Sequence, residues 1–287
     1  MTDLELQQQR EHKWHLDGNP IRTIEDARGF VAEAGFCLMY PERALPAVPA
    51  FIGAYAGSGD NLPDAKHAFA DTRAKPAREL MVRLLREKSA FEMRWSGDAE
   101  LIVSPELFPY FYSLVSDRKP KSPPKTLAQG APVSPLAANI FEAIRKHGPL
   151  NKQRLRELVS REASDAALDR ALGELWSALK IMRVDYRAGE GAFWDLLARW
   201  APEAAKEGLD ISEPEAISAL LSKYLESAVA ATQDETEQLF SHFTSRSKVR
   251  EAIGALLTAR ELTASAMGTR TLLQLAPVHP EPRRIHG

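Results

Sequence analysis

Two stretches of this sequence repeat one pattern: three short segments with helical apolar spacing, then two short strands around a glycine-containing turn. The first stretch runs from Ser134 to Pro202 and the second from Glu213 to Pro277. Three helices closed by a β-hairpin are the elements of a winged helix, a variant of the helix-turn-helix. The repeat therefore predicts a mainly α fold with small β-hairpins, in the α+β class, built from tandem winged-helix domains.

Apolar periodicity and capping residues place the elements of both repeats. In the first repeat we expect helices over 135–146, 151–160 and 165–179, then a wing around Gly189-Glu190-Gly191. In the second we expect helices over 214–231, 233–242 and 246–260, then a hairpin around Met267-Gly268. Thr232 and Glu235 have the spacing of a capping box, which supports the start of the middle helix.

The N-terminal part has a weaker version of the same pattern. Residues 1–20 look like a loose polar lead-in, and Thr23 is placed to cap a helix over 24–34. An apolar segment, 36–40, follows, and we expect it to be buried. A helix over 75–88, an aromatic segment over 108–115 and two strands, 91–95 and 99–103, complete the region. The strands flank Ser96-Gly97-Asp98, which predicts a hairpin and a possible degenerate third copy.

Composition and turn residues predict the domain organisation. We expect an N-terminal domain over 1–117, a Pro- and Lys-containing linker over 118–132, winged-helix domains over 133–202 and 203–277, and a polar tail over 278–287. Hydrophobic content of 44% and charged content of 26% are ordinary for a globular protein.

The sequence excludes several classes of protein. It has no apolar run long enough for a membrane helix and no apolar signal-peptide core, so we expect no membrane partner. A single cysteine, Cys37, excludes an internal disulfide and fits a cytoplasmic location. We expect no metal site and no cofactor, because zinc-ligand spacing and phosphate-binding loops are both missing. The oligomeric state is left open.

The charge of the chain is unevenly distributed. Its formal net charge is −2, but residues 66–125 hold twelve Lys/Arg against eight Asp/Glu, and residues 201–240 hold two against nine. Attraction for phosphate depends on where positive charge lies, so any DNA-binding face must be local. These charges could equally belong to solvated helix faces.

The best local candidate is the start of the third helix of the second repeat. Recognition helices present their N-terminal residues to the major groove, and wings contact the backbone or minor groove. Cations at a helix N-terminus oppose the helix dipole, which favours a role towards an anionic partner. The candidate residues there are Arg246, Ser247, Lys248 and Arg250, with Arg270 on the wing. A second candidate patch consists of Arg78, Arg83 and Arg86. Pairing with Glu251, or packing over apolar surface, is the alternative for the first group.

The N-terminal helix entering the apolar segment Cys37-Leu38-Met39-Tyr40-Pro41, followed by successive winged helices, resembles the AlkZ-like (YcaQ-like) winged-helix DNA glycosylases. The resemblance extends over roughly residues 21–277. It implies affinity for double-stranded DNA and a role in DNA repair on alkylated or crosslinked bases. In that family a Gln–apolar–Gln motif positions the attacking water, and the equivalent positions here are Cys37 and Met39. Neither side chain can orient water as an amide does.

Three functions therefore remain open. The leading one is a DNA-binding relative of these glycosylases that lacks the Gln-x-Gln motif. The second is an active glycosylase that uses other residues, with Glu25, Asp26 and Glu33 as candidate carboxylates. The third is a protein-interaction or ligand-sensing module without DNA binding.

Overall fold

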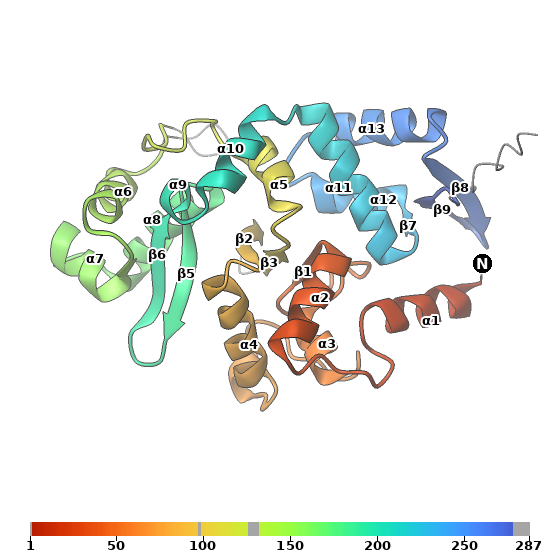
Figure 1. The fold of residues 1–287 in the computed structure, drawn as a ribbon, viewed down its shortest axis with the longest axis horizontal. Helices are drawn as coiled ribbons and strands as arrows, with labels where there is room; N and C mark the ends of the chain where they lie inside the picture. The colour runs from red at the N-terminus through yellow and green to blue at the C-terminus, as the bar shows by residue number, and fades with distance from the viewer. Residues whose placement is uncertain (1, 97–98, 126–131, 278–287) are drawn as a thin grey trace, which may run out of the picture.

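The computed structural model describes residues 2–96, 99–125 and 132–277 (Figure 1). Within these ranges one element order occurs three times: a helix, a short strand, two more helices and a two-stranded hairpin. In each copy the short strand pairs with the second hairpin strand, giving sheets in the orders β1-β3-β2, β4-β6-β5 and β7-β9-β8. The tandem winged-helix prediction is thus confirmed, and the N-terminal copy has the complete set of elements.

The N-terminal unit begins at Thr23, the helix cap expected from the sequence, whose hydroxyl accepts from Asp26 N–H in a capping box. Its elements are α2 (Ile24–Ala34), β1 (Phe36–Leu38), α3 (Phe51–Ala56), α4 (Ala74–Arg86), β2 (Phe91–Ser96) and β3 (Ala99–Val103). A short 3₁₀ turn, η1 (Ala68–Ala70), lies between α3 and α4. The predicted turn residues Gly97 and Asp98 lie outside the described residues.

The other two units follow the sequence prediction closely. The middle unit contains α6 (Pro135–His147), β4 (Leu150–Asn151), α7 (Lys152–Val159), α8 (Asp165–Ser177), β5 (Ile181–Arg187) and β6 (Gly191–Leu196). The C-terminal unit contains α11 (Glu213–Ala228), β7 (Ala231–Thr232), α12 (Gln233–Phe240), α13 (Arg246–Thr258), β8 (Leu262–Met267) and β9 (Arg270–Leu275). The two-residue strands β4 and β7 are too short for a recognisable pattern, and the sequence did not predict them.

The expectation of a loose lead-in over residues 1–20 is wrong. Residues Asp3–Lys13 form a helix, α1, with a capping box between Thr2 and Glu5. The sequence of α1 is polar because most of the helix faces solvent. Its C-terminal end is held instead by hydrogen bonds to the end of α11, which lies beside it only in the folded chain.

Three further helices join the units. They are α5 (Phe108–Val115), α9 (Leu197–Trp200) and α10 (Pro202–Asp210). Helix α10 packs closely on α5 at Gly208, where a Cβ atom would lie 2.7 Å from the Pro109 carbonyl oxygen. This contact requires glycine, because any side chain would collide with the α5 backbone.

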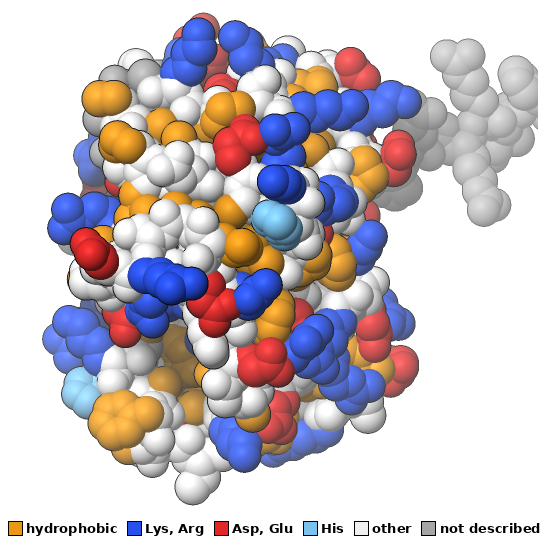
Figure 2. All heavy atoms as spheres, turned by 90° about the vertical axis from the view of Figure 1, so that its left-hand side faces the viewer, with side chains coloured by type: hydrophobic (Ala, Val, Ile, Leu, Met, Phe, Trp, Pro, Cys, Tyr) orange, Lys and Arg blue, Asp and Glu red, His pale blue; other side chains and the backbone are white. Residues whose placement is uncertain are grey.

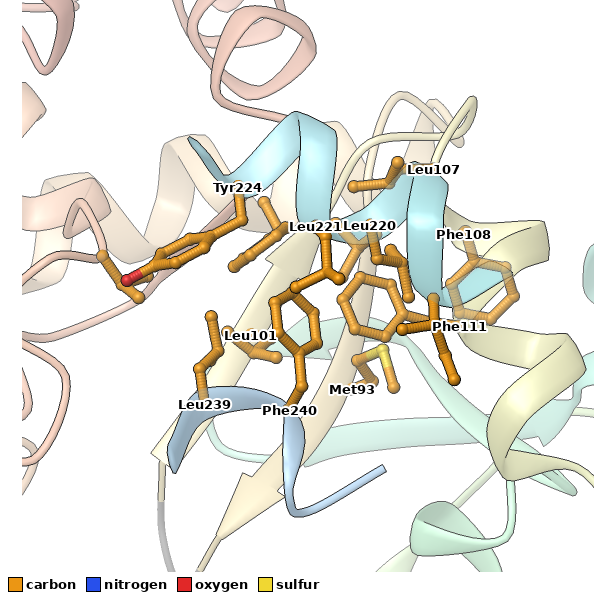
Figure 3. Packing of buried hydrophobic residues seen from close by; sticks show 14 of the residues in the cluster. Met93, Leu101, Leu107, Phe108, Phe111, Leu220, Leu221, Tyr224, Leu239 and Phe240 are labelled. Carbon is orange, nitrogen blue, oxygen red and sulfur yellow. The ribbon is translucent and has the colours of Figure 1, made fainter. Parts of the chain in front are cut away.

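The main hydrophobic core is common to the three units. It contains β1–β3 residues such as Leu101, wing residues such as Met182, and α11–α13 residues such as Leu221 and Phe240. Figure 3 shows side chains of α11, including Leu220, Leu221 and Tyr224, above Met93 and Leu101 of the β2–β3 hairpin. Two smaller cores lie within the N-terminal and middle units. The predicted division into separate domains remains a prediction, but the central core extends across its boundaries.

The end of the predicted N-terminal domain and the start of the predicted linker are both held to the middle unit. Lys180 is buried, and its Nζ donates to Asp117 Oδ1 at 2.5 Å and to the Lys119 carbonyl oxygen at 2.7 Å. Residues 126–131 of the linker and the predicted tail, 278–287, lie outside the described residues.

Candidate nucleic-acid interface

The start of α13 carries the cations that the sequence predicts to contact DNA. Ser245 caps the helix, and Arg246, Lys248 and Arg250 are exposed on its first turns. Lys248 Nζ lies 2.7 Å from Glu213 Oε2, and Arg250 Nε lies 2.7 Å from Glu237 Oε1. Arg246 has no carboxylate within salt-bridge distance among the described residues.

The remaining candidates are distributed over the molecule. Arg270 on the C-terminal wing pairs with Asp3, Arg78 Nη2 lies 3.1 Å from Glu100 Oε2, and Arg86 Nε lies 2.6 Å from Asp185 Oδ1. Arg83 is exposed, and Ser247 Oγ lies 2.9 Å from the capping hydroxyl of Ser245. In Figure 1 α4 lies near the bottom and α13 at the top right, so the structure does not bring the two patches together.

Five of the predicted DNA-binding cations therefore have carboxylate partners. The pairs of Lys248 and Arg270 are exposed on both sides, and exposed pairs contribute only about 0–1 kcal/mol. The partner of Arg250 is different, because the Glu237 side chain is only 4% exposed. A phosphate could replace the carboxylate of an exposed pair at small cost. The face formed by α6, α7 and the β5–β6 wing shows Lys/Arg and Asp/Glu side chains interspersed, with a hollow in its lower part (Figure 2).

The strand β1 and the residue after it place both motif-equivalent side chains in the interior. Cys37 and Met39 are 0% and 1% exposed and belong to the core beneath α2, α3 and α4. Burial raises the pKa of the Cys37 thiol, so the group stays neutral. In this conformation neither side chain can touch DNA or a solvent water.

The three carboxylates proposed as alternatives all lie on the exposed face of α2. Asp26 is occupied as the reciprocal partner in the Thr23 capping box, accepting from Thr23 N–H at 3.0 Å. Hydrogen bonds from the Thr23 backbone are the main cause of its lowered pKa. Glu25 and Glu33 are exposed and point away from the core. The structure does not bring the three together with Cys37 and Met39.

A buried ionic cluster lies beside the end of β1, and no local sequence pattern predicts it. Arg183 on β5 donates to Glu92 Oε1 at 3.1 Å and to Glu100 Oε1 at 3.0 Å. Arg78 on α4 donates to Glu100 Oε2 at 3.1 Å. The backbone N–H of Met39 donates to the Glu100 carbonyl oxygen at 3.1 Å, which fixes the cluster next to residues 37–41, the motif-equivalent segment.

The pKa values of the two carboxyl groups in this cluster are shifted in opposite directions. Complete burial raises the pKa of Glu92 to about 8, against the opposing charge of Arg183. Burial also acts to raise the pKa of Glu100, but Arg183 and Arg78 outweigh it and the net shift is downward. Near neutral pH, Glu92 therefore holds the proton and Glu100 is the carboxylate. Glu92 Oε2 and Arg183 Nε have no hydrogen-bond partner among the described residues.

Only part of this cluster reaches the surface. Glu92 is fully enclosed, whereas the side chains of Glu100 and Arg78 are 16% and 27% exposed. The Arg183 guanidinium contacts two indoles, 5.0 Å from the Trp176 ring centre and 5.4 Å from that of Trp194. The available signal in the sequence was Glu92 between apolar strand residues, but its partner Arg183 is 91 positions away.

A shallow hollow of about 360 Å³ opens just beyond the motif-equivalent segment. Its lining combines four apolar residues with four polar ones: Pro41, Glu42, Arg43, Pro46, Leu62, Pro63, Asp64 and His67. Within the described residues, no group of three His, Cys, Asp or Glu side chains is arranged to hold a metal ion.

Three successive helix–strand–helix–helix–hairpin units define a tandem winged-helix protein. The chain belongs to the AlkZ-like DNA glycosylase family, whose model matches residues 56–285. The structure of Streptomyces sahachiroi DNA glycosylase AlkZ is similar, with a TM-score of 0.57 and 17% sequence identity over 96% of this chain and 70% of that chain. No curated protein sequence matches this chain significantly.

The family match begins after the motif-equivalent segment, so the replacement of both glutamines remains a prediction. In the described part of the chain, none of the helices combines the length and apolarity needed to cross a membrane.

Proposed function

We propose that this protein binds double-stranded DNA and lacks the glutamine-based chemistry of its family. The observation that carries the proposal is the start of α13, where Arg246, Lys248 and Arg250 lie on the first turns of the third helix of a winged helix. That is the position from which recognition helices contact DNA. The exposed pair of Lys248 with Glu213 can be exchanged for a phosphate at small cost, and Arg246 has no carboxylate partner among the described residues.

The burial of Cys37 and Met39 supports the second half of the proposal. A side chain that positions the attacking water must lie within hydrogen-bond distance of that water. A neutral buried thiol and a buried thioether meet neither the geometric nor the chemical requirement.

Salt-dependent duplex binding tests the assignment to α13. A variant carrying Arg246→Glu, Lys248→Glu and Arg250→Glu should lose most of its affinity. If three phosphate contacts are lost, the slope of log K against log salt should fall in magnitude by about 2.7. The matched control carries Lys146→Glu, Arg170→Glu and Lys206→Glu, three exposed residues away from α13. Equal losses in both variants would rule out α13 as the contact.

A second candidate function is an active glycosylase that uses Glu100. The observation that favours it is a partly exposed carboxylate, fixed by two arginines, beside the motif-equivalent segment. Glu100 would accept a proton from the water that attacks the sugar C1′, while the departing base takes the electron pair of the glycosidic bond.

Abasic-site formation on alkylated and crosslinked duplexes tests this second candidate. Glu100→Gln should abolish product while leaving DNA binding unchanged. No product from the wild-type protein on any of these lesions would end the hypothesis. Failure to bind duplex at low salt, with a stable oligomer, would instead favour a protein-interaction or ligand-sensing module.

A further inference from the structure

The aromatic ring of Phe69 is almost completely exposed. It is 90% exposed on the 3₁₀ turn η1, whereas the other exposed large apolar residues, Leu4, Leu158 and Tyr186, range from 40% to 65%. A phenylalanine left in water does not contribute the stabilisation of about 1.5–3 kcal/mol that its burial would give. A ring held this far from the core calls for a physical explanation.

The segment that carries Phe69 is the connection between the second and third helices of the N-terminal unit. It comprises residues 57–73, whereas the same connection comprises only 160–164 in the middle unit and 241–245 in the C-terminal unit. In a helix-turn-helix the third helix enters the groove with its N-terminal end, so the residues just before it lie next to DNA. The longer segment therefore places Phe69 on the side of this unit that would approach DNA.

Hydrogen bonds hold this turn in a fixed shape. Asp64 Oδ1 accepts from the backbone N–H of His67 at 2.9 Å, and the His67 carbonyl oxygen accepts from Ala70 N–H at 3.1 Å. Arg73 Nη2 donates to the Asn61 carbonyl oxygen at 2.6 Å and closes the segment. A ring on a fixed turn loses little conformational entropy when it binds a partner.

The surroundings of Phe69 suit a nucleic acid better than a protein. Its neighbours Lys66, His67, Ala70 and Thr72 are all exposed, and they do not form a contiguous apolar patch with the ring. Protein interfaces require a larger apolar area, whereas base stacking requires one ring and a nearby cation for the phosphate. Neither Lys66 nor Lys75 has a carboxylate within salt-bridge distance in the described part of the chain.

From these observations we propose that Phe69 stacks on a base of DNA whose pairing is locally broken. The site would give the protein a preference for duplexes that contain an unpaired base. His67, two residues before Phe69, also lines the hollow beside the motif-equivalent segment. This inference rests on the DNA binding proposed above and adds the class of DNA that is preferred.

Binding of the full-length protein to two duplexes tests the inference. The duplexes have the same sequence, and one of them contains a single unpaired 2-aminopurine. Because stacking on a base is worth about 1–3 kcal/mol, the wild-type protein should bind the second duplex about 5- to 150-fold more tightly and quench its fluorescence. Phe69→Ala should remove both effects and retain affinity for the paired duplex. Phe69→Trp should retain the preference, and Leu4→Ala, another exposed apolar residue, should behave as wild type.

The possible outcomes separate the two proposals. Equal binding of both duplexes by the wild-type protein, or an undiminished preference in Phe69→Ala, would overturn the stacking role and leave DNA binding standing. If the wild-type protein binds neither duplex at low salt, the proposed function fails and the inference fails with it. A lower sedimentation coefficient for Phe69→Ala without DNA would identify Phe69 as a contact between copies of the chain, which also overturns the inference.

Discussion

At the scale of single residues, Glu92 makes stability depend on pH. The folded protein keeps the Glu92 proton up to about pH 8, whereas an unfolded glutamate loses it near its ordinary value. Between about pH 5 and 8 the folded state binds more protons, so its free energy of unfolding falls as the pH rises. Glu92→Gln has no proton to lose, and its stability should fall less over this range. Urea unfolding at both ends of the range measures the difference.

An exposed glutamate provides the control for that experiment. Glu33→Gln on α2 should keep the pH dependence of the wild-type protein. An identical slope in Glu92→Gln and the wild type would mean that the folded protein does not hold this proton.

Cys37 offers a direct chemical test of whether the motif-equivalent segment is sealed. Only the thiolate reacts with disulfide reagents, and burial both raises the pKa of this thiol and blocks access to it. We expect no reaction in the native state over the time in which a free thiol reacts completely, and full reaction in denaturant. Rapid native labelling, followed by absorbance, would show that β1 opens to solvent and would return Cys37 and Met39 to consideration as site residues.

At the scale of elements, α1 serves as the C-terminal cap of α11. The last carbonyl groups of a helix have no partner within it. Here Glu226, Ser227 and Ala228 offer theirs to side chains of α1 and the residue after it: Lys13 Nζ at 2.8 Å, Trp14 Nε1 at 2.9 Å and Arg10 Nε at 3.0 Å. The buried Trp14 therefore ties the N-terminus to the C-terminal unit.

Removing the indole N–H tests this cap. Trp14→Phe keeps most of the apolar contact but leaves the buried Ser227 carbonyl without its donor, which should cost about 1–3 kcal/mol. The midpoint of urea unfolding measures the loss. Trp200→Phe is the control, because its indole N–H has no hydrogen-bond partner among the described residues. A loss as large in the control would mean that the cap adds nothing.

Elements with strong local signals were predictable from the sequence, and those fixed by distant partners were not. Thr23 and Thr232 are helix caps that pair with an acidic residue three positions further on. Because this signal is local, the starts of α2 and α12 could be predicted. Helix α1 shows little apolar periodicity, because its partner is the end of α11 more than 200 residues on. The cluster around Glu92 escaped prediction for the same reason, since Arg183 comes from another unit. The sequence shows where the predicted DNA-binding cations lie along the chain. It does not show which carboxylates pair with them, because those partners come from other elements.

At the scale of the whole molecule, the central core predicts that the winged helices unfold together. Phe111 on α5 is fully buried between Phe36 of the N-terminal unit, 5.6 Å away between ring centres, and Phe243 of the C-terminal unit, 5.0 Å away. Units that fold independently would each show their own unfolding transition, whereas units with a common core unfold together in one cooperative transition.

Phe111→Ala should therefore lower the free energy of unfolding by about 3–5 kcal/mol and shift one single transition. Calorimetry combined with tryptophan fluorescence can follow this, because Trp95 reports on the junction with the C-terminal unit and Trp194 on the middle unit. Phe141→Ala, within the separate core of the middle unit, serves as the comparison and should shift the same transition. If each variant instead splits off a transition of its own unit, the domains are thermodynamically independent and the core between them does not couple their folding.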